Sequence, residues 1–571
     1  MRVVPNVPAI RRSFDYLVPE QFRGQVRIGT IVRIDVHGRR VRGWVTELDV
    51  SPPAGVALKP IAKVTGWGPP ADVVDLARWA AWRWAGHPSA LLGTASPPTA
   101  VRGLPPPRSA RTPPPTAADP LADHALARGR AVVRLPPAAD PFPYVLAAAR
   151  RGNALVVCPS IGRARRVAAR LGRAGAPVAL MPHDWARAAA GATVVGARAA
   201  AWAPVPDLAA VVVIDEHDEA HQEERTPTWH ARDVAIERAA RAGVPAVLLS
   251  PCPTLEALNW GDRLTVSTTD ERSGWPPVDV VDRRDDDPRR AGLYSERLVA
   301  RLRERTDGRV VFVLNRKGRS RLLACVACGN LARCERCGSA VTLPEAGRLL
   351  CTRCGRARPQ VCLVCGAIAM KNLRVGVSRI REELEALVNE PVGEVTGGQP
   401  PASNAPRVLV GTEAVLHQLD NAHMVAFLDF DQELLAPRYR AAEQALALLA
   451  RAARLVGGRR PGARLIVQTR LPQHPVVQSA LHADPDRLVL DERPRRQALA
   501  YPPYAALASV SGPAAEAFIA AVGAPLGVEV LGPADGRWLL RAPDHATLGN
   551  ALAATDRPPG RLRLEVDPLR V

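Results

Sequence analysis

The pattern of apolar and polar positions changes twice along the chain. Up to about residue 67 it alternates over short runs such as VRIGTIVRIDVHG and VRGWVTEL, which is typical of the strands of a small, twisted barrel or sheet with glycine at its turns. DVVDLARWAAWRWAG follows with helical periodicity and closes this unit. From about 97 to 120, PPTAVRGLPPPRSARTPPPTAADP is too rich in proline for a helix or a strand and predicts an extended linker.

After the linker, short apolar runs alternate with helical segments. ALVVCPS, PVALMP, ATVVGAR, AAVVVIDE and PAVLLSP form one such series, and RVVFVLN, RVLVGT, MVAFLDFD and ARLIVQT form a second. Strands that are apolar throughout and are separated by helices predict parallel sheets covered on both faces. We therefore expect an α/β protein with two tandem RecA-like parallel-sheet lobes, the architecture on which nucleotide-driven motors are built.

These changes predict five segments. They are an N-terminal β-rich domain (1–96), the linker (97–122), a first lobe (123–278), a second lobe (279–490) with an insertion at 325–365, and a small α+β C-terminal domain (491–571). MRVVPNVPAIRR lacks the apolar region of a signal peptide, and no apolar run approaches the roughly 20 residues of a membrane span. We expect a cytoplasmic protein that does not enter a membrane.

The net charge of +20 and the pI of about 10.4 favour a polyanionic partner such as nucleic acid. Of the 76 basic residues, however, only four are lysine, and arginine, alanine and proline are abundant together, as GC-rich codon usage would produce without selection for binding. The charge therefore raises the expectation of nucleic-acid binding only modestly.

Eight of the ten cysteines lie between residues 325 and 365, in four CxxC pairs. Paired cysteines in a chain without an export signal indicate metal rather than disulfides, and four thiolates suit tetrahedral Zn²⁺. GSAVTLPEAGRLL, between the second and third pairs, predicts the hairpin of a zinc ribbon. We therefore expect two structural zinc ions in a nested arrangement, one on Cys334, Cys337, Cys351 and Cys354 and the other on Cys325, Cys328, Cys362 and Cys365. Cys158 and Cys252 are expected to be small core residues.

VVVIDEHDEAH, residues 211–221, is a buried strand that ends in two carboxylates. In nucleotide-driven motors such an Asp holds magnesium and the Glu orients water, but a glycine-rich loop with Lys and Ser or Thr must hold the phosphates. No GKT or GKS occurs, since Pro, Val, Gly and Asn follow the four lysines. We therefore interpret Asp215 and Glu216 as degenerate remnants that serve as helix caps or surface charge, and we expect His217 and His221 to be exposed polar residues.

The order of motifs resembles the primosomal replication restart helicase family, PriA (primosomal protein N′), over almost the whole chain. The matching motifs are SFDYLVPE, IDE-HD followed by WHARD, VLNRKG, the four CxxC pairs, LVGTEAVL, YRAAEQ, YPPY and the terminal VDP. The resemblance implies a protein, expected to be a nucleoid-associated monomer, that recognises stalled or collapsed replication forks and reloads the replisome. The partners it implies are branched DNA, 3′ ends and single strands, primosomal and replisome-loading proteins, and single-stranded DNA-binding protein.

The resemblance also implies that the first domain captures a DNA 3′ end with Phe14, Asp15, Tyr16, Gly38 and Lys59. The two rings are suited to stacking on the terminal base, the carboxylate to accepting from the 3′ hydroxyl, glycine to close backbone approach and lysine to a phosphate. The alternative is that the two rings only fill the core of the barrel.

The chain departs from the family where ATP would bind. At 132–146, where the family has its phosphate loop, proline replaces glycine and the expected Lys and hydroxyl are missing. SPCPTLE replaces the SATP-type motif of the family. In RAARLVGG, residues 451–458, Arg454 lies one residue from the position of the first expected arginine finger, and Gly458 is at the position of the second. The linker is too short for the family's winged helix.

These departures leave binding of ATP and Mg²⁺ in doubt and predict a fork-binding, replisome-loading scaffold without helicase activity. The first alternative is an active ATP-dependent 3′–5′ DNA helicase with an unusual nucleotide site. The second is a zinc-ribbon adaptor that binds protein rather than DNA.

Overall fold

The chain folds into two compact units in the computed structural model. Unit 1 comprises Met1–Val133, Asp140–Leu264 and Leu499–Pro568, and unit 2 comprises Arg134–Ala139, Thr265–Ala498 and Leu569–Val571. The structure describes residues 1–570 except 8, 9, 11, 52–56, 107–118, 285, 287–292, 304–307, 315–322, 346, 352, 373–376 and 396–404. Residues 107–118 of the expected linker (97–122) thus lie outside the described residues. Among those described, no helix has the length and apolar character needed to span a bilayer.

The N-terminal part of unit 1 is an antiparallel sheet with strand order β2-β1-β4-β3-β5. Its strands are β1 (Arg2–Pro5), β2 (Phe14–Asp15), β3 (Ile31–Val36), β4 (Arg39–Glu47) and β5 (Lys63–Gly66), followed by helices α1 (Ala71–Arg83) and α2 (Pro88–Ala95). Val3, Val32, Ile34 and Val45 are fully buried in the core on one side of the sheet. The alternating pattern arises because successive side chains of a strand point to opposite faces.

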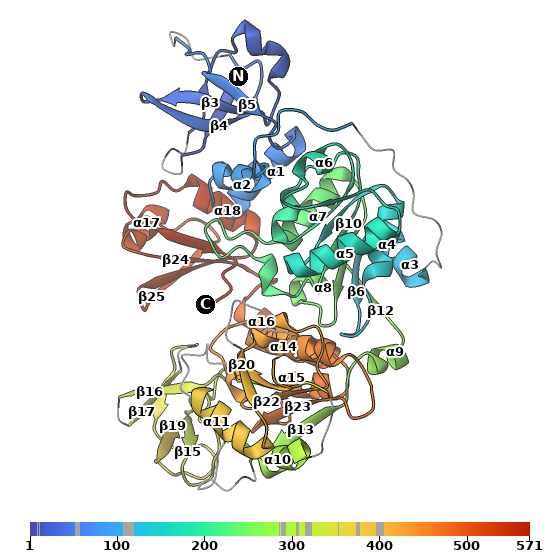
Figure 1. Cartoon of the computed structure of the whole chain (residues 1–571). Helices are drawn as coiled ribbons and strands as arrows, with labels where there is room; N and C mark the ends of the chain where they lie inside the picture. The colour runs from blue at the N-terminus through green and yellow to red at the C-terminus, as the bar shows by residue number, and fades with distance from the viewer. Residues whose placement is uncertain are drawn as a thin grey trace. The chain divides into compact units, whose positions relative to one another are not determined.

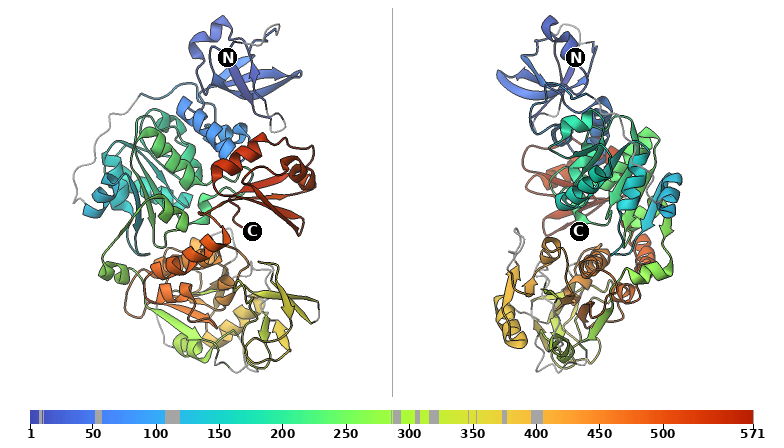
Figure 2. Two further views of the ribbon diagram at one scale, coloured as in Figure 1. Left: turned by 180° about the vertical axis from the view of Figure 1, so that it is seen from behind. Right: turned by 45° about the vertical axis from the view of Figure 1, so that its right-hand side comes forward.

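The lobe of unit 1 is a seven-stranded sheet with order β12-β6-β11-β10-β7-β9-β8 (Figure 1). Its strands are β6 (Arg130–Arg134), β7 (Asn153–Val157), β8 (Val178–Leu180), β9 (Thr193–Gly196), β10 (Leu208–Ile214), β11 (Ala246–Ser250) and β12 (Asp262–Thr265). Its helices are α3 (Pro120–Ala127), α4 (Phe142–Arg150), α5 (Ile161–Arg173), α6 (Trp185–Ala189), α7 (Ala231–Ala242) and α8 (Leu255–Trp260). β10 runs parallel to β7 and β11, and helices cover both faces, as the views in Figure 2 show. The expected α/β class is confirmed.

The C-terminal segment also belongs to unit 1. It forms a four-stranded sheet, β25-β26-β24-β27, from β24 (Ala506–Ser511), β25 (Glu529–Ala534), β26 (Arg537–Ala542) and β27 (Arg563–Val566), with helices α17 (Ala515–Val522) and α18 (His545–Ala554). It is joined to α1 by an ion pair of 2.7 Å between Arg83 and Asp567, and to the lobe by the Thr228 hydroxyl, which donates to the Val566 carbonyl at 2.8 Å. Segments from both ends of the chain thus share one hydrophobic core.

Unit 2 contains a six-stranded parallel sheet with order β13-β23-β22-β14-β21-β20. Its strands are β13 (Val278–Asp282), β14 (Val310–Val313), β20 (Val392–Val395), β21 (Val408–Gly411), β22 (Met424–Phe427) and β23 (Arg464–Thr469). Its helices are α9 (Thr268–Ser273), α10 (Glu296–Arg303), α11 (Val377–Val388), α12 (Val415–Gln418), α13 (Asp431–Leu434), α14 (Ala441–Val456), α15 (Pro475–Leu481) and α16 (Asp486–Leu499). A second parallel sheet confirms the tandem lobes.

The cysteine-rich insertion of unit 2 follows β14 and has two small sheets of its own. β15 (Leu323–Cys325) pairs with β19 (Met370–Asn372), and between them β16 (Val341–Glu345), β17 (Arg348–Cys351) and β18 (Ala357–Pro359) form a three-stranded meander. β16 and β17 are the hairpin predicted between the second and third CxxC pairs. The outer pair of strands brings the two ends of the insertion together.

Candidate functional sites

The four CxxC segments fold into the same knuckle. In each, the amide of the glycine after the second cysteine donates to the carbonyl of the first cysteine, at 2.9 to 3.0 Å. These glycines, Gly329, Gly338, Gly355 and Gly366, all have φ between 71° and 73°, where a side chain is strained. The sequence signal that predicts the knuckle is thus CxxCG rather than CxxC alone.

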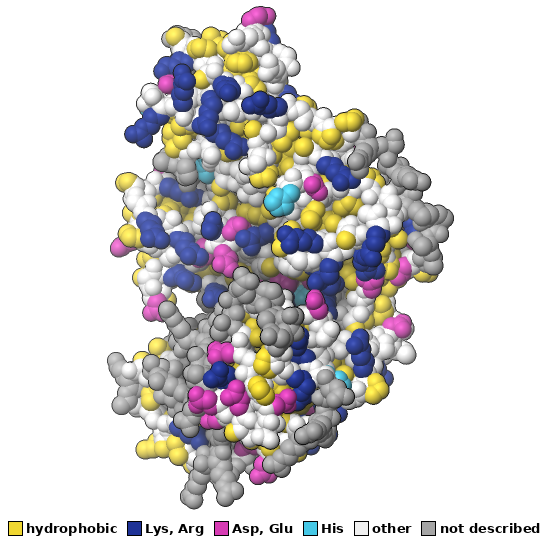
Figure 3. All heavy atoms as spheres, viewed as in Figure 1, with side chains coloured by type: hydrophobic (Ala, Val, Ile, Leu, Met, Phe, Trp, Pro, Cys, Tyr) yellow, Lys and Arg dark blue, Asp and Glu magenta, His cyan; other side chains and the backbone are white. Residues whose placement is uncertain are grey.

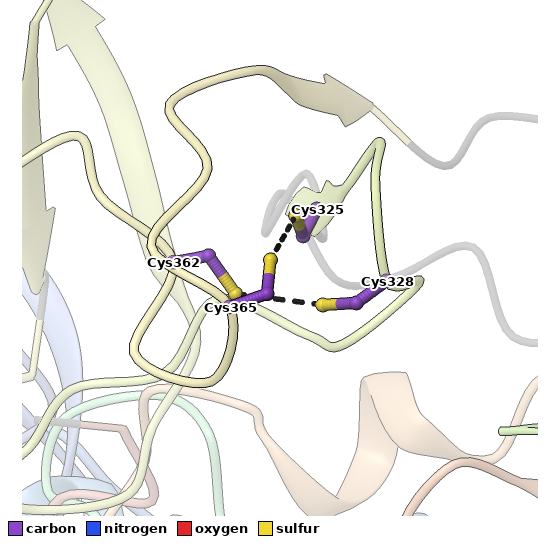
Figure 4. A group of neighbouring side chains, drawn as sticks. All are labelled: Cys325, Cys328, Cys362 and Cys365. Atoms are coloured by element: carbon purple, nitrogen blue, oxygen red, sulfur yellow. Dashed lines mark hydrogen bonds between the residues drawn. The ribbon is translucent and has the colours of Figure 1, made fainter.

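The knuckles bring the cysteines together in two groups of four. One group is Cys325, Cys328, Cys362 and Cys365, and the other is Cys334, Cys337, Cys351 and Cys354; within each group the sulfurs lie within 4.8 Å of one another. In the first group the Cys325 and Cys365 sulfurs are 3.5 Å apart, and the sulfurs point toward one another (Figure 4). A tetrahedron with metal–sulfur bonds of about 2.3 Å has sulfurs about 3.8 Å apart. Each group therefore has the donors and the size to hold a metal ion.

Three of the five residues expected to capture a DNA 3′ end, Tyr16, Gly38 and Lys59, form hydrogen bonds with one residue, Asp35. Its side chain accepts from the Gly38 amide at 3.3 Å and from Lys59 Nζ at 3.2 Å, and its carbonyl accepts from the Tyr16 hydroxyl at 2.7 Å. The bond from Lys59 lowers the pKa of Asp35. Sequence reasoning missed Asp35, although its place three residues before a glycine in a β-turn, IDVHG, is a known signal for a side chain that bonds the turn.

The turn beside Asp35 explains the glycine. His37 and Gly38 both have positive φ, 51° and 77°, and they join β3 to β4 as a two-residue hairpin loop. Space around the Gly38 α-carbon is open, since a Cβ there would meet no atom within 4 Å. Lys59 is also open to solvent, with 68% of its side chain exposed. The turn and Lys59 thus offer an open surface with an exposed positive charge beside Gly38.

The two aromatic residues and the acidic residue of this set differ in exposure. Tyr16 is only 4% exposed, so its ring fills the core and its hydroxyl helps to position Asp35 rather than offering a face for stacking. Phe14 is half-buried on the edge strand β2, with the Arg12 guanidinium 5.1 Å from its ring centre. Asp15 is paired with Arg2 at 3.0 Å. Of the two rings, only Phe14 has an accessible part.

The carboxylates after β10 are buried, and the expectation that they are surface charge is wrong. Glu216 is 0% exposed and accepts from the Thr254 amide at 2.8 Å, the Thr254 hydroxyl at 2.9 Å and Arg232 Nη1 at 3.1 Å. Burial raises the pKa of Glu216, which Arg232 and Thr254 partly oppose. Asp215 is 4% exposed and has a φ of 54°. Through these hydrogen bonds Glu216 connects the end of β10 to Arg232 on α7 and to Thr254, the residue before α8.

The histidines near this strand are also less exposed than expected. His221 is fully buried, with Nε2 3.0 Å from the Ile214 carbonyl oxygen, and burial lowers its pKa. His217 is half-buried, with Nδ1 2.8 Å from the Ser250 hydroxyl. Both side chains bond neighbouring strands because the chain turns back over the sheet after Asp215. Cys158 and Cys252 are buried as expected.

The segment that corresponds in position to the family's phosphate loop has its backbone amides engaged in hydrogen bonds within the chain. The Ala138 amide donates to the Gly274 carbonyl at 3.1 Å, and the Ala139 amide donates to the Pro136 carbonyl at 2.9 Å. Pro136 and Pro137 have no amide hydrogen. These four residues thus leave no free amide to bind a phosphate.

Arg454, next to the first expected arginine finger, also belongs to this closed arrangement. Its Nε donates to the Pro137 carbonyl at 3.0 Å. At Gly458, the second expected position, an added Cβ would lie 2.9 Å from the Ser273 carbonyl oxygen, and φ is +74°. Gly458 therefore has no room for an arginine side chain.

The N-terminus of α4, a natural anion site, is occupied by Asp140. The Asp140 carboxylate accepts from the Phe142 amide at 3.1 Å and forms a two-pronged pair with Arg170 at 2.8 and 2.6 Å. Burial alone would raise the pKa of Asp140, but the bonds from Arg170 and Phe142 lower it overall. The positive end of the helix is thus satisfied by a carboxylate of the chain itself.

Comparison with known proteins gives matches at both the domain and the chain level. The family model of the PriA 3′DNA-binding domain (3′BD) matches residues 2–97. The chain is 32% identical over 377 residues to the replication restart protein PriA of Treponema pallidum, covering 60% of this chain and 57% of that protein. It is 29% identical over 348 residues to that of Bacillus subtilis, covering 56% and 43%.

A mycobacterial relative matches over a greater length. The chain is 29% identical over 592 residues to the probable replication restart protein PriA of Mycobacterium tuberculosis, covering 93% of this chain and 90% of that protein. The chain thus spans about half the length of the Treponema and Bacillus relatives and nine tenths of the mycobacterial one.

Proposed function

The chain belongs to the family of the replication restart protein PriA, and from this premise we propose that it binds stalled or collapsed replication forks and helps to reload the replisome without acting as a helicase. The observation that carries the proposal is the surface formed by Gly38, Lys59 and Asp35 within the segment that matches the 3′DNA-binding domain. An exposed lysine beside an open glycine turn suits a terminal phosphate, and a carboxylate suits a 3′ hydroxyl.

In this proposal Phe14 stacks on the terminal base with its accessible part, and Asp15 or Asp35 accepts from the 3′ hydroxyl. Lys59 contacts the last phosphate, and Gly38 lets the strand approach the backbone. Tyr16 acts through Asp35, to whose carbonyl it donates. Because Asp35 is already bonded to Lys59, an incoming phosphate would compete for the lysine while the hydroxyl takes its place on the carboxylate.

The absence of motor activity is supported by four features of the described residues. The amides of Ala138 and Ala139 donate to backbone carbonyls, and Arg454 donates to the Pro137 carbonyl. The Asp140 carboxylate accepts from the N-terminus of α4, and the Glu216 carboxylate accepts from Arg232 and Thr254. Phosphoryl transfer requires preorganised donors, a metal and an arginine to share the charge of the triphosphate, and the groups named above are each already bonded within their own unit. Binding of ATP and Mg²⁺ would therefore require these bonds to break.

We further propose that the two cysteine groups hold zinc and that the insertion serves as a rigid docking element. Four thiolates around one centre favour Zn²⁺ over Mg²⁺ or Ca²⁺, which prefer oxygen ligands. Such sites are structural, so their role here is to fix the knuckles. We propose that the chain acts as a monomer in the cytoplasm at the nucleoid, with primosomal and replisome-loading proteins and single-stranded DNA-binding protein as partners. Its proposed domains are residues 1–96, 123–278, 279–490 and 491–571, with a linker at 97–122.

The experiment measures binding of the full chain to synthetic forks whose leading strand ends in a 3′ hydroxyl or a 3′ phosphate. The proposal expects tighter binding of the hydroxyl form, and it expects Lys59→Ala to weaken binding of that form. Arg23→Ala is the matched control, because Arg23 is 69% exposed in the same domain and pairs only locally with Glu20. Equal affinity for both forks and for blunt duplex would contradict the proposal.

Two further measurements decide between the alternatives. DNA-stimulated ATP hydrolysis would favour the active helicase. An adaptor that binds protein rather than DNA would be favoured if the full chain bound neither forks nor 3′ ends but bound a primosomal protein, and if removal of residues 325–365 abolished that binding.

A further inference from the structure

The outward face of the N-terminal sheet carries three cations in one row. Lys63 on β5 lies opposite Arg33 on β3, and Arg33 lies opposite Arg42 on β4. Residues that face each other across antiparallel strands share a face of the sheet, with Cβ atoms about 4.5 to 5.5 Å apart. We call Lys63, Arg33 and Arg42 the basic row. Figure 3 shows Lys and Arg side chains gathered on the visible face of this domain.

Within the described part of the chain, no carboxylate neutralises the basic row. Arg33 and Lys63 are exposed, and their side chains have no hydrogen-bond or ion-pair partner among the described residues. Arg42 is half-buried, with its Nε buried and unbonded and its guanidinium carbon 5.6 Å from the centre of the Trp44 ring. Asp35, two residues from Arg33 and on the same face, is bonded to Lys59 instead.

Like charges placed directly opposite each other destabilise a sheet. This repulsion affects Arg42, whose pKa is lowered mainly by burial and also by the charge of Arg33. A stack of three cations over about 10 Å, two strand spacings, is thus unfavourable in the free protein. An anion that lies along the row would relieve the repulsion and provide acceptors for the guanidinium groups, which suit phosphate geometry.

We propose that the basic row binds the phosphates of the DNA strand whose 3′ end is held at Asp35, Gly38 and Lys59. The proposal rests on the proposed function and extends it from the terminal nucleotide to the strand that leads there. Asp35 and Arg33 are two residues apart on β3, about 7 Å, so the row begins beside the end-binding surface. The row consists of cations without hydrogen-bond acceptors, so it is suited to phosphates and not to distinguishing base sequences.

The test compares the full chain with the variant Arg33→Gln/Arg42→Gln/Lys63→Gln, using a single-stranded 12-mer with a free 3′ hydroxyl at several salt concentrations. Each phosphate contact on a single strand contributes about −0.7 to the slope of log K against log salt, so the variant's slope should be less steep by about 2. Binding of a dinucleotide with a free 3′ hydroxyl, which is too short to reach the row, should stay unchanged.

The matched control is Arg23→Gln/Arg128→Gln/Arg225→Gln, three exposed arginines elsewhere on unit 1, which should leave the slope unchanged. Arg33→Lys/Arg42→Lys keeps the charge and should keep most of the slope. The glutamine variant should also melt no lower than the parent chain at low salt, because it removes repulsion.

The outcomes separate the basic row from capture of the 3′ end. The proposal for the basic row is overturned if the slope of log K against log salt is unchanged in the glutamine variant. It is also overturned if the variant loses binding only because its melting temperature falls. A reduced slope supports the row even if the parent chain fails to bind the dinucleotide, and that second result contradicts 3′-end capture alone. If the slope is reduced equally in the Arg23, Arg128 and Arg225 control, binding depends only on the total charge of the chain, and the proposal for the basic row is overturned.

Discussion

Arg232→Met is the substitution that most sharply separates a structural Glu216 from a catalytic one. Glu216 is fully buried and Arg232 is 4% exposed, so removing the guanidinium leaves a buried carboxylate without its counter-charge. Breaking a buried pair in this way costs about 3 to 5 kcal/mol in free energy of unfolding. Glu216→Gln keeps an oxygen for Thr254, and Arg232 keeps its pair with Asp233 at 2.8 Å, so this change should cost less, about 1 to 3 kcal/mol.

The cost of Arg232→Met should depend on pH. The pKa of Glu216 is raised by burial, and Arg232 holds it down in part, so removing Arg232 raises it further. Where the native state holds a proton that the unfolded state has lost, stability falls as pH rises from the ordinary glutamate pKa of about 4.3 through the folded one. The destabilisation should therefore be larger at pH 7.5 than at pH 5.

The assay is urea unfolding followed by tryptophan fluorescence, with Trp202 and Trp229 in edge-to-face contact within unit 1. The matched control is Arg241→Met on the same helix, whose pair with Glu237 is 37% and 29% exposed and should contribute no more than about 1 kcal/mol. A cost below 1 kcal/mol for Arg232→Met would refute the reasoning. So would a Glu216→Gln chain that keeps full stability but loses a nucleotide-dependent activity.

Three other predictions follow from the geometry. Metal analysis should find two ions per chain, and one in each of Cys325→Ser and Cys351→Ser, since these belong to different groups. Asp35→Asn should reduce the preference for a 3′ hydroxyl in fork binding, because Lys59 loses its charged partner and the hydroxyl loses an acceptor. Asp567→Asn should lower the free energy of unfolding by about 3 kcal/mol at pH 7, as measured by thermal unfolding. The pair with Arg83 and the contact with His545 hold the pKa of Asp567 far below its usual range despite burial, so the difference between variant and parent should shrink as pH falls below about 4.

The sequence predicts those parts of the fold that depend on local pattern. The apolar run of β10 predicts a strand buried on both faces, and the CxxC spacing together with the intervening hairpin predicts both groups of cysteines. These features are predictable because strand burial and metal-ligand spacing are set within a few residues. The same is true of Pro136 and Pro137, whose lack of an amide hydrogen follows from the sequence alone, whereas the bonds that engage the Ala138 and Ala139 amides are seen only in the structure.

What the sequence does not predict are contacts between distant residues. Arg232 lies 16 residues after Glu216, and Thr254 lies 38 residues after it, so the burial of that carboxylate depends on how α7 and the residues before α8 return to the sheet. Asp35 likewise joins groups from Tyr16 to Lys59. The joining of the C-terminal segment to α1 through Arg83 and Asp567 spans almost the whole chain. Local periodicity contains no information on such pairings.

The most direct test of the central claim is the rate of ATP hydrolysis by the full chain saturated with a fork that ends in a 3′ hydroxyl. We expect a rate no greater than that of a Glu216→Gln chain. The amides of Ala138 and Ala139 are bonded within the chain, Arg454 is bonded to Pro137, and Glu216 is buried. Fork-stimulated hydrolysis that Glu216→Gln abolishes, with fork binding intact, would contradict the claim.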